Sequence, residues 1–190
     1  MLLATFATEA FVATTHKVEK GDSLWRIAVK YQVGLSEIKA ANPTIKNYDL
    51  IYPGQIINIP TVDSAAVAYE KEVVRLVNEI RQENGLKPLT MDWQLSRVAR
   101  YKSQDMSDLG YFSHTSPTYG SPFEMMGSFG ISYRTAGENI AKGYRTAETV
   151  VNGWMNSPGH RANILNSTYT HIGVGYVSKG NYWTQMFISK

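Results

Sequence analysis

The sequence predicts an α+β protein of two domains: a small β-α-α-β module over residues 16–60, then an α/β/α sandwich with an antiparallel sheet over residues 67–190. Two short amphipathic helical segments lie between two short apolar strands in the first part. Longer helical patterns follow, and the chain ends in two stretches of alternating apolar residues, which are typical of strands. A chain of 190 residues that is 43% hydrophobic and 18% charged can bury cores of this kind.

Local signals predict the four elements of the first module. We expect a strand over residues 16–20, helices over 24–31 and 35–41, and a strand over 56–59. Asp22 or Ser23 can cap the first helix, and its buried face would carry Leu24, Ile27, Ala28 and Tyr31. The second helix should end at Asn42, because a residue before proline is pushed out of the helical region.

This module resembles the LysM family, which the stretches VEKGDSLWRIAVKYQVGLSEIKAANP and LIYPGQIINIP match nearly end to end. The resemblance implies binding of glycans that contain N-acetylglucosamine, such as peptidoglycan or chitin. The family's groove lies between the first strand–helix loop and the loop before the last strand. By position it implies these glycan-binding residues: Gly21, Asp22, Ser23, Leu24, Leu50, Ile51, Tyr52, Pro53 and Gln55.

Two alternatives stay open within the module. Turn geometry alone would account for Gly21, Pro53 and Gly54, because turn residues answer first to backbone conformation. Trp25 is expected in the core rather than as a platform for a sugar.

The segments on either side of the module carry weaker signals. Residues 1–15 are apolar but begin without Lys or Arg, so we interpret them as the remainder of an export signal or as a tail. They are too short to cross a membrane as a helix, and no transmembrane span is expected. Residues 61–66, which follow Pro60, form the predicted linker.

The second domain should begin with two long helices. Ser64 can cap the first, which carries an apolar stripe from Val67 to Ile80 and ends at Asn84-Gly85. Thr90 can cap the second, which ends at Gly110. The residues expected to face inward from the second helix are Leu95, Val98, Ala99, Met106 and Leu109.

Shorter elements follow. Ser121 and Glu124 form a capping box around Pro122 and predict a short helix that ends near Gly130. We then expect a strand over residues 136–140, a helix opened by Thr146, and a helix capped by Ser157 with Pro158 at its first position. The tail should form a hairpin of two strands joined through residues 179–181.

The second domain resembles the bacterial branch of the CAP superfamily (cysteine-rich secretory proteins, antigen 5 and pathogenesis-related proteins). The motifs that carry the resemblance are YFSHTSP, GENIA, WMNSPGHRANIL, IGVGY and YWTQMF. It implies an α/β/α sandwich with a cleft lined by two His and, in many members, two Glu. The matching positions are His114, Glu138 and His160. Ser157 stands where many eukaryotic relatives carry an acidic residue, and the chain has no cysteine for their disulfides.

The residues His114, Glu138 and His160 would suit Zn²⁺ or another divalent cation, with a fourth position left for a water that the metal could activate. The start of a helix disfavours an imidazolium, so His160 should be neutral. Three interpretations stay open: a metal site, a structural hydrogen-bond network, or a catalytic site. Ser113 beside His114 does not make a triad. Tyr111, Tyr119, Tyr133 and Trp183 could form the floor of a groove or belong to the core.

These features predict a secreted bacterial protein of the cell wall or spore envelope, anchored to glycan by the LysM module. The CAP domain would bind metal, a ligand or a wall or spore-coat protein without turnover. The alternative is a metal-dependent hydrolase, either a peptidase or an enzyme active on peptidoglycan. No organic cofactor is expected. The net charge of +3 without a basic run gives no indication of nucleic-acid binding.

Overall fold

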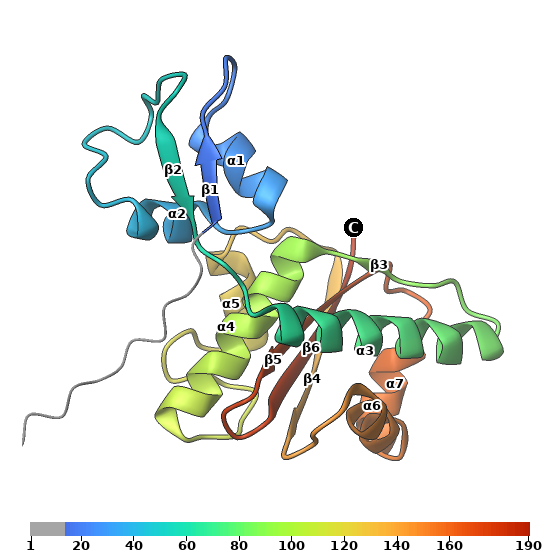
Figure 1. Cartoon of the computed structure of the whole chain (residues 1–190). Coiled ribbons are helices and arrows are strands. Elements are labelled where there is room, and N and C mark those ends of the chain that lie inside the picture. Colours follow the sequence, from blue (N-terminus) through green and yellow to red (C-terminus); the bar gives the residue numbers. More distant parts are fainter. Residues whose placement is uncertain (1–13) are drawn as a thin grey trace, which may run out of the picture. The chain divides into compact units, whose positions relative to one another are not determined.

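The computed structural model describes residues 14–190, so residues 1–13 of the predicted signal or tail lie outside the described part. The chain divides into two compact units between Val62 and Asp63 (Figure 1).

The first unit has the four predicted elements in the predicted order. They are β1 (Thr14–Lys17), α1 (Leu24–Tyr31), α2 (Leu35–Ala41) and β2 (Ile56–Ile59). The two strands are antiparallel, with Thr14 opposite Ile59 and Lys17 opposite Ile56. β1 begins two residues before the predicted start and ends at Lys17 rather than at residue 20. Beyond it, Val18 still exchanges backbone hydrogen bonds with Gln55 and Gly54.

Ser23, rather than Asp22, caps α1, because its hydroxyl accepts a hydrogen bond from the Arg26 backbone N–H. Gly34 and Asn42 flank α2 as expected. The unit is held together by a core of buried apolar side chains from both helices and the sheet: Val18, Leu24, Ile27, Ala28, Val33, Ile38, Ile57 and Ile59.

The expectation that Trp25 is a core residue is wrong. Its side chain is 62% exposed. Each residue of an α-helix turns by about 100°, so Trp25 lies off the stripe that Leu24, Ile27 and Ala28 bury. The large ring is therefore available on the surface of the first unit.

The second unit is an α/β/α sandwich. Its elements are α3 (Ser64–Glu83), β3 (Thr90–Met91), α4 (Trp93–Leu109), α5 (Pro122–Ser128), β4 (Thr135–Lys142), α6 (Ala147–Met155), α7 (Pro158–Ile164), β5 (His171–Val177) and β6 (Tyr182–Ser189). The strand order is β3-β5-β6-β4. β4, β6 and β5 pair antiparallel as predicted, whereas the two residues of β3 pair parallel to β5.

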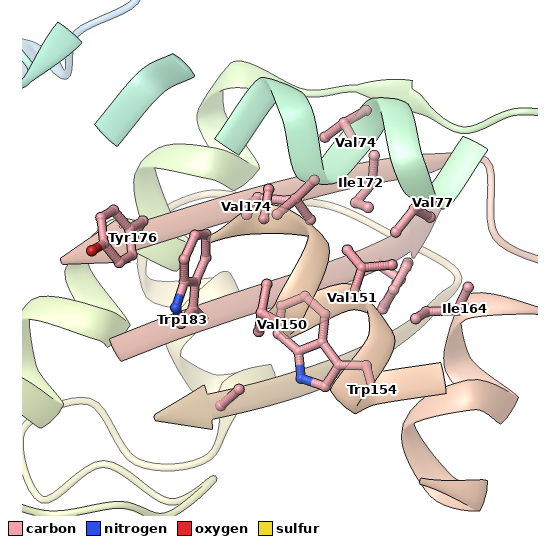
Figure 2. Close-up of a cluster of buried hydrophobic side chains, with 14 of the residues drawn as sticks. Val74, Val77, Val150, Val151, Trp154, Ile164, Ile172, Val174, Tyr176 and Trp183 are labelled. Atoms are coloured by element: carbon pink, nitrogen blue, oxygen red, sulfur yellow. The ribbon is translucent and has the colours of Figure 1, made fainter. Parts of the chain in front are cut away.

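The helices cover the two faces of this sheet with separate cores. α3, α6 and α7 pack on one face, where Val77, Trp154 and Ile164 meet Ile172 and Trp183 (Figure 2). α4 and α5 pack on the other, where Leu95 and Met125 lie in one cluster with Met186. The two buried indoles donate to the carbonyls of Ile140 and Tyr144, which removes the cost of burying their N–H groups. Trp183 is thus a core residue.

Two predicted helix caps are displaced toward an aspartate. Asp63, not Ser64, caps α3 by accepting from the Ala65 N–H. Asp92, not Thr90, caps α4 by accepting from the Leu95 N–H, and Thr90 belongs to β3. Leu109 is also not buried: it is 58% exposed in the last turn of α4, beyond the buried stripe that ends at Met106.

Two glycines of β5 allow α4 to lie directly on the sheet. A Cβ atom at Gly173 would overlap the backbone of Leu95 and Ser96, and one at Gly175 the backbone of Ala99 and Arg100. This close approach explains the glycines of the IGVGY motif.

No helix in residues 14–190 is both long enough and apolar enough to cross a bilayer.

Candidate functional site

A histidine–glutamate pair joins an exposed loop to the interior of the second unit. His114 lies in the loop between α4 and α5, and its side chain is 54% exposed. Its Nδ1 donates to Oε1 of Glu138 at 2.7 Å, and the Glu138 side chain is 1% exposed. Because the acceptor is a carboxylate, this bond fixes both the ring orientation and the tautomer of His114. The structure therefore brings together two of the three predicted ligands.

The third, His160, is attached to the same strand through its backbone carbonyl. Successive side chains of a strand point to opposite faces of the sheet, so the side chains of Glu138 and Asn139 leave β4 in opposite directions. The Asn139 amide donates to the carbonyl of His160 at 3.1 Å, and its oxygen accepts from Asn163 at 2.8 Å. Asn163 also donates to the Glu138 carbonyl. These bonds tie α7 to β4 at the edge of the sheet.

Burial lowers the pKa of His160, and the positive charge of a protonated His114 lowers it further. The His160 ring is thus biased toward the neutral form, as predicted. The largest cause is burial rather than the helix start. Ser157 occupies the N-cap position of α7, but its side chain makes no cap hydrogen bond.

A buried lysine, which the sequence analysis missed, supports the His114 loop. Lys102 lies on α4 with no exposed surface, and its Nζ donates to the His114 carbonyl at 2.9 Å and to Tyr111 Oη at 3.2 Å. Burial lowers the pKa of Lys102, while the charges of Glu138 and Asp105 oppose this effect. The sequence could have indicated this residue, because helical periodicity places Lys102 on the same buried face of α4 as the apolar residues.

Asp105 organises the rest of the same loop. Its carboxylate accepts from the hydroxyls of Ser116, Thr118 and Tyr111 at 2.5–2.7 Å. Burial alone would raise the pKa of Asp105, but these hydrogen bonds outweigh it and the pKa falls below the usual value. The pKa of Tyr111 is raised by its burial and by its bond to Asp105. Tyr111 is therefore part of the support of the loop.

The arrangement fits a metal centre only in part. In favour of a metal, Oε2 of Glu138 is buried without a hydrogen-bond partner. Over the described residues, however, His, Asp and Glu side chains form no group of three that could hold a metal ion. Glu138 faces the Nδ1 of His114, as an orienting partner does, rather than a shared centre. The three-ligand metal site stays a prediction.

The Ser113 side chain is bonded within its own loop. Its hydroxyl accepts from the Thr115 backbone N–H. A separate cavity of about 510 Å³ in this unit includes Asp92, Tyr133, Arg134 and Lys190 in its lining, but not His114, Glu138 or His160.

The first unit carries a small groove of about 210 Å³. Four of the residues predicted to bind glycan line it: Asp22, Ser23, Leu24 and Ile51. Five further residues were not predicted there: Trp25, Leu35, Lys39, Tyr48 and Asp49. The sequence could have indicated that Leu35 and Lys39 lie together, because residues four apart on a helix share one face.

The other predicted glycan-binding residues lie outside the lining of this groove. Leu50 and Tyr52 are exposed, at 51% and 60%. Pro53 lies in the turn before β2, and the Gln55 side chain accepts from the Tyr52 N–H. Gly21 has a φ of +95°, which a residue with a side chain rarely adopts, and its carbonyl accepts from Arg26.

A small two-stranded module with a groove between its loops, followed by an α/β/α sandwich with a His–Glu pair at an edge strand, defines a two-domain protein of CAP type. Comparison with family models agrees. The chain belongs to the cysteine-rich secretory protein family (CAP), whose model matches residues 74–188, and it carries a LysM domain at residues 16–60.

Known proteins resemble both parts. The uncharacterized protein YkwD of Bacillus subtilis is 67% identical over 127 residues, which are 67% of this chain and 49% of that protein. The N-acetylmuramoyl-L-alanine amidase sle1 of Staphylococcus epidermidis is 34% identical over 76 residues, 40% of this chain and 23% of the amidase. A crystal structure of an extracellular Bacillus anthracis protein containing an SCP domain aligns with a TM-score of 0.64 and 35% identity, covering 73% of this chain and 47% of that one.

This chain thus spans at most about half the length of these relatives.

Proposed function

We propose that this protein is an extracellular bacterial protein of the cell wall or spore envelope. Its LysM domain retains it on glycan that contains N-acetylglucosamine, and its CAP domain presents the His114–Glu138 pair to a ligand or a partner protein. The proposal treats the CAP domain as a binding domain rather than an enzyme.

One observation carries the anchoring part of the proposal. The loop before α1 and the loop before β2, which are far apart in the sequence, both line the 210 Å³ groove. The groove combines polar groups, such as Ser23, with exposed apolar side chains, such as Trp25, a mixture suited to the hydroxyl groups and apolar faces of a sugar. The similarity to an N-acetylmuramoyl-L-alanine amidase and to an extracellular SCP protein supports the same location.

The binding role of the CAP domain rests on the exposure of His114. The Glu138 carboxylate accepts the hydrogen bond from Nδ1 of His114, and over half of the His114 side chain is exposed to solvent. A ring held in one orientation by a buried carboxylate can offer its remaining nitrogen, Nε2, to a ligand with little loss of side-chain entropy.

The second candidate is a metal-dependent hydrolase. The unpartnered Oε2 of Glu138 favours it. A bound zinc ion would supply an activated water. The described side chains do not form a three-ligand group, so we derive no hydrolytic step from them.

Retention on purified peptidoglycan tests the anchoring proposal. The full chain should sediment with insoluble peptidoglycan, and a variant that lacks residues 16–60 should stay in the supernatant. The E138Q variant is the matched control and should sediment like the wild type, because Glu138 belongs to the other unit. Equal retention after the deletion would rule out LysM anchoring.

A further inference from the structure

We propose that the groove of the LysM domain contains a subsite for a carboxylate, formed by the Lys39 ammonium, so that the domain prefers acidic N-acetylglucosamine glycan over neutral chitin. This inference rests on the proposed glycan binding and specifies which class of glycan the groove takes. The acidic group is the carboxylate of a lactyl ether on the neighbouring sugar, as in muramic acid.

Lys39 is held at the groove by its neighbours. It lies on α2 one turn after Leu35, and both residues line the cavity. Its Nζ lies 5.3 Å from the centroid of the Tyr48 ring. The Tyr48 hydroxyl in turn donates to the Lys39 carbonyl at 3.1 Å, which fixes the ring against the end of α2. The half-buried Lys39 side chain therefore has a defined place in the groove.

The positive charge of Lys39 is the property that the subsite uses. Within residues 14–190, no carboxylate forms an ion pair with it. Asp22, which also lines the groove, is already engaged: its Oδ2 accepts from His16 Nε2 and from the Glu19 backbone N–H, both at 2.8 Å. An ammonium that lies over an aromatic ring and has no ion-pair partner in the described part of the chain is well placed to receive an anion from a ligand.

The other lining groups suit the rest of a sugar. Trp25 is 62% exposed, and with Leu35 and Ile51 it offers apolar surface to a sugar face. The exposed Asp49 carboxylate can accept hydrogen bonds from hydroxyl groups, but it would repel an acidic ligand. Lys39 and Asp49 thus act in opposite directions on an acidic glycan.

This pair of opposing charges distinguishes two glycans that share N-acetylglucosamine. Chitin is uncharged, so neither residue should discriminate it by charge. A strand in which N-acetylglucosamine alternates with N-acetylmuramic acid carries a carboxylate on every second sugar when its peptides have been removed. Lys39 can donate a charge-assisted hydrogen bond to that carboxylate.

Calorimetric titration of the full chain with two soluble probes tests the subsite: a chitin oligosaccharide, and a peptide-free oligosaccharide of N-acetylglucosamine and N-acetylmuramic acid of equal length. The wild type should bind the acidic probe more tightly. K39M should weaken acidic binding roughly threefold to tenfold, the range for one charged hydrogen bond at a part-exposed position, and leave chitin binding unchanged. D49N should strengthen acidic binding alone.

K46M is the matched control, because Lys46 is an exposed lysine of the same unit outside the groove lining, and it should change neither affinity. Equal weakening of both probes by K39M would show that Lys39 only shapes the groove and would overturn the subsite. No effect of K39M on either probe would overturn it as well. Wild-type protein that binds neither probe would instead remove the proposed glycan binding on which the subsite rests.

A peptide-bearing strand gives a further arm of the same test. In this strand the lactyl carboxyl is joined to the peptide as an amide and carries no negative charge. The preference of the LysM domain for this strand over chitin should therefore disappear. If the protein still prefers the peptide-bearing strand over chitin, and K39M does not reduce this preference, the recognised acidic group lies in the peptide. That result would overturn the assignment to the lactyl carboxylate.

Discussion

The Glu138 carboxylate, buried at the edge strand β4, accepts a hydrogen bond from Nδ1 of the exposed His114 at 2.7 Å. This bond orients a solvent-facing imidazole from within the sandwich. The second oxygen of Glu138 is buried without a partner. The pair therefore combines an oriented ring with an unfilled hydrogen-bonding capacity.

If the two imidazoles hold a metal, the full chain should bind Zn²⁺ in calorimetry and H160A should abolish the binding. E138Q should weaken it about tenfold to 100-fold, as loss of an orienting carboxylate does. H171A is the control, because His171 is also half-buried but its Nδ1 is bonded to Thr170. Binding by H160A as tight as that of the wild type would refute the assigned ligands.

The Lys102 ammonium should stabilise the fold through the His114 loop. K102M removes the donor to the His114 carbonyl and to Tyr111, and takes a cation away from the buried Glu138. We expect the free energy of unfolding to fall by about 1–3 kcal/mol in urea denaturation, the cost of leaving buried polar groups without partners. K87M, at an exposed lysine, should change it by less than about 0.5 kcal/mol. Equal values for both variants would contradict this role.

Asp105 should make the stability depend on pH in the acid range. Its pKa is lower in the folded state, so its contribution is fully present above its unfolded value of about 3.9 and is lost as the pH falls through the folded value. The stability difference between the wild type and D105N should therefore be larger at pH 6 than at pH 3. Urea unfolding of both proteins at pH 6 and at pH 3 measures this difference. A difference that does not change with pH would argue against the prediction.

The contact of α4 with β5 should not tolerate a methyl group at Gly175. G175A would place Cβ against the backbone of Ala99 and Arg100, which cannot move away as a flexible side chain can. We expect a loss of at least about 1–3 kcal/mol in unfolding free energy. G127A, in α5 with open space around the added atom, should be neutral or stabilising by up to about 1 kcal/mol. Similar effects of the two substitutions would show that the sheet accommodates the change.

Much of the fold followed from local signals. The capping box of Ser121 and Glu124, the glycine end of α4 at Gly110 and the tight turn before β6 all form as expected. Each depends on hydrogen bonds and dihedral angles within a few residues, which a short stretch of sequence specifies. The caps at Asp63 and Asp92 differ from the prediction because residues one or two positions apart could each have served, and neighbouring structure decided between them.

The residues around the candidate sites were only partly predictable. Resemblance identified His114, Glu138 and His160, but it did not indicate that Glu138 bonds His114 directly while His160 is attached through Asn139. Similarly, Trp25 and Lys39 come to one groove through the packing of α1 and α2, which a hydrophobic pattern does not resolve.

By itself, the sequence determined the order and type of the elements other than the short strand β3, the two-domain organisation and the family, because periodicity, caps and motifs are local properties of the chain. Only the tertiary structure decided that Lys102 is buried beneath the His114 loop, that Asp105 gathers three hydroxyls, and that Gly175 meets the backbone of α4. These relationships join residues from separate elements. Their distances follow from how helices pack on the sheet, and that packing is a property of the whole domain.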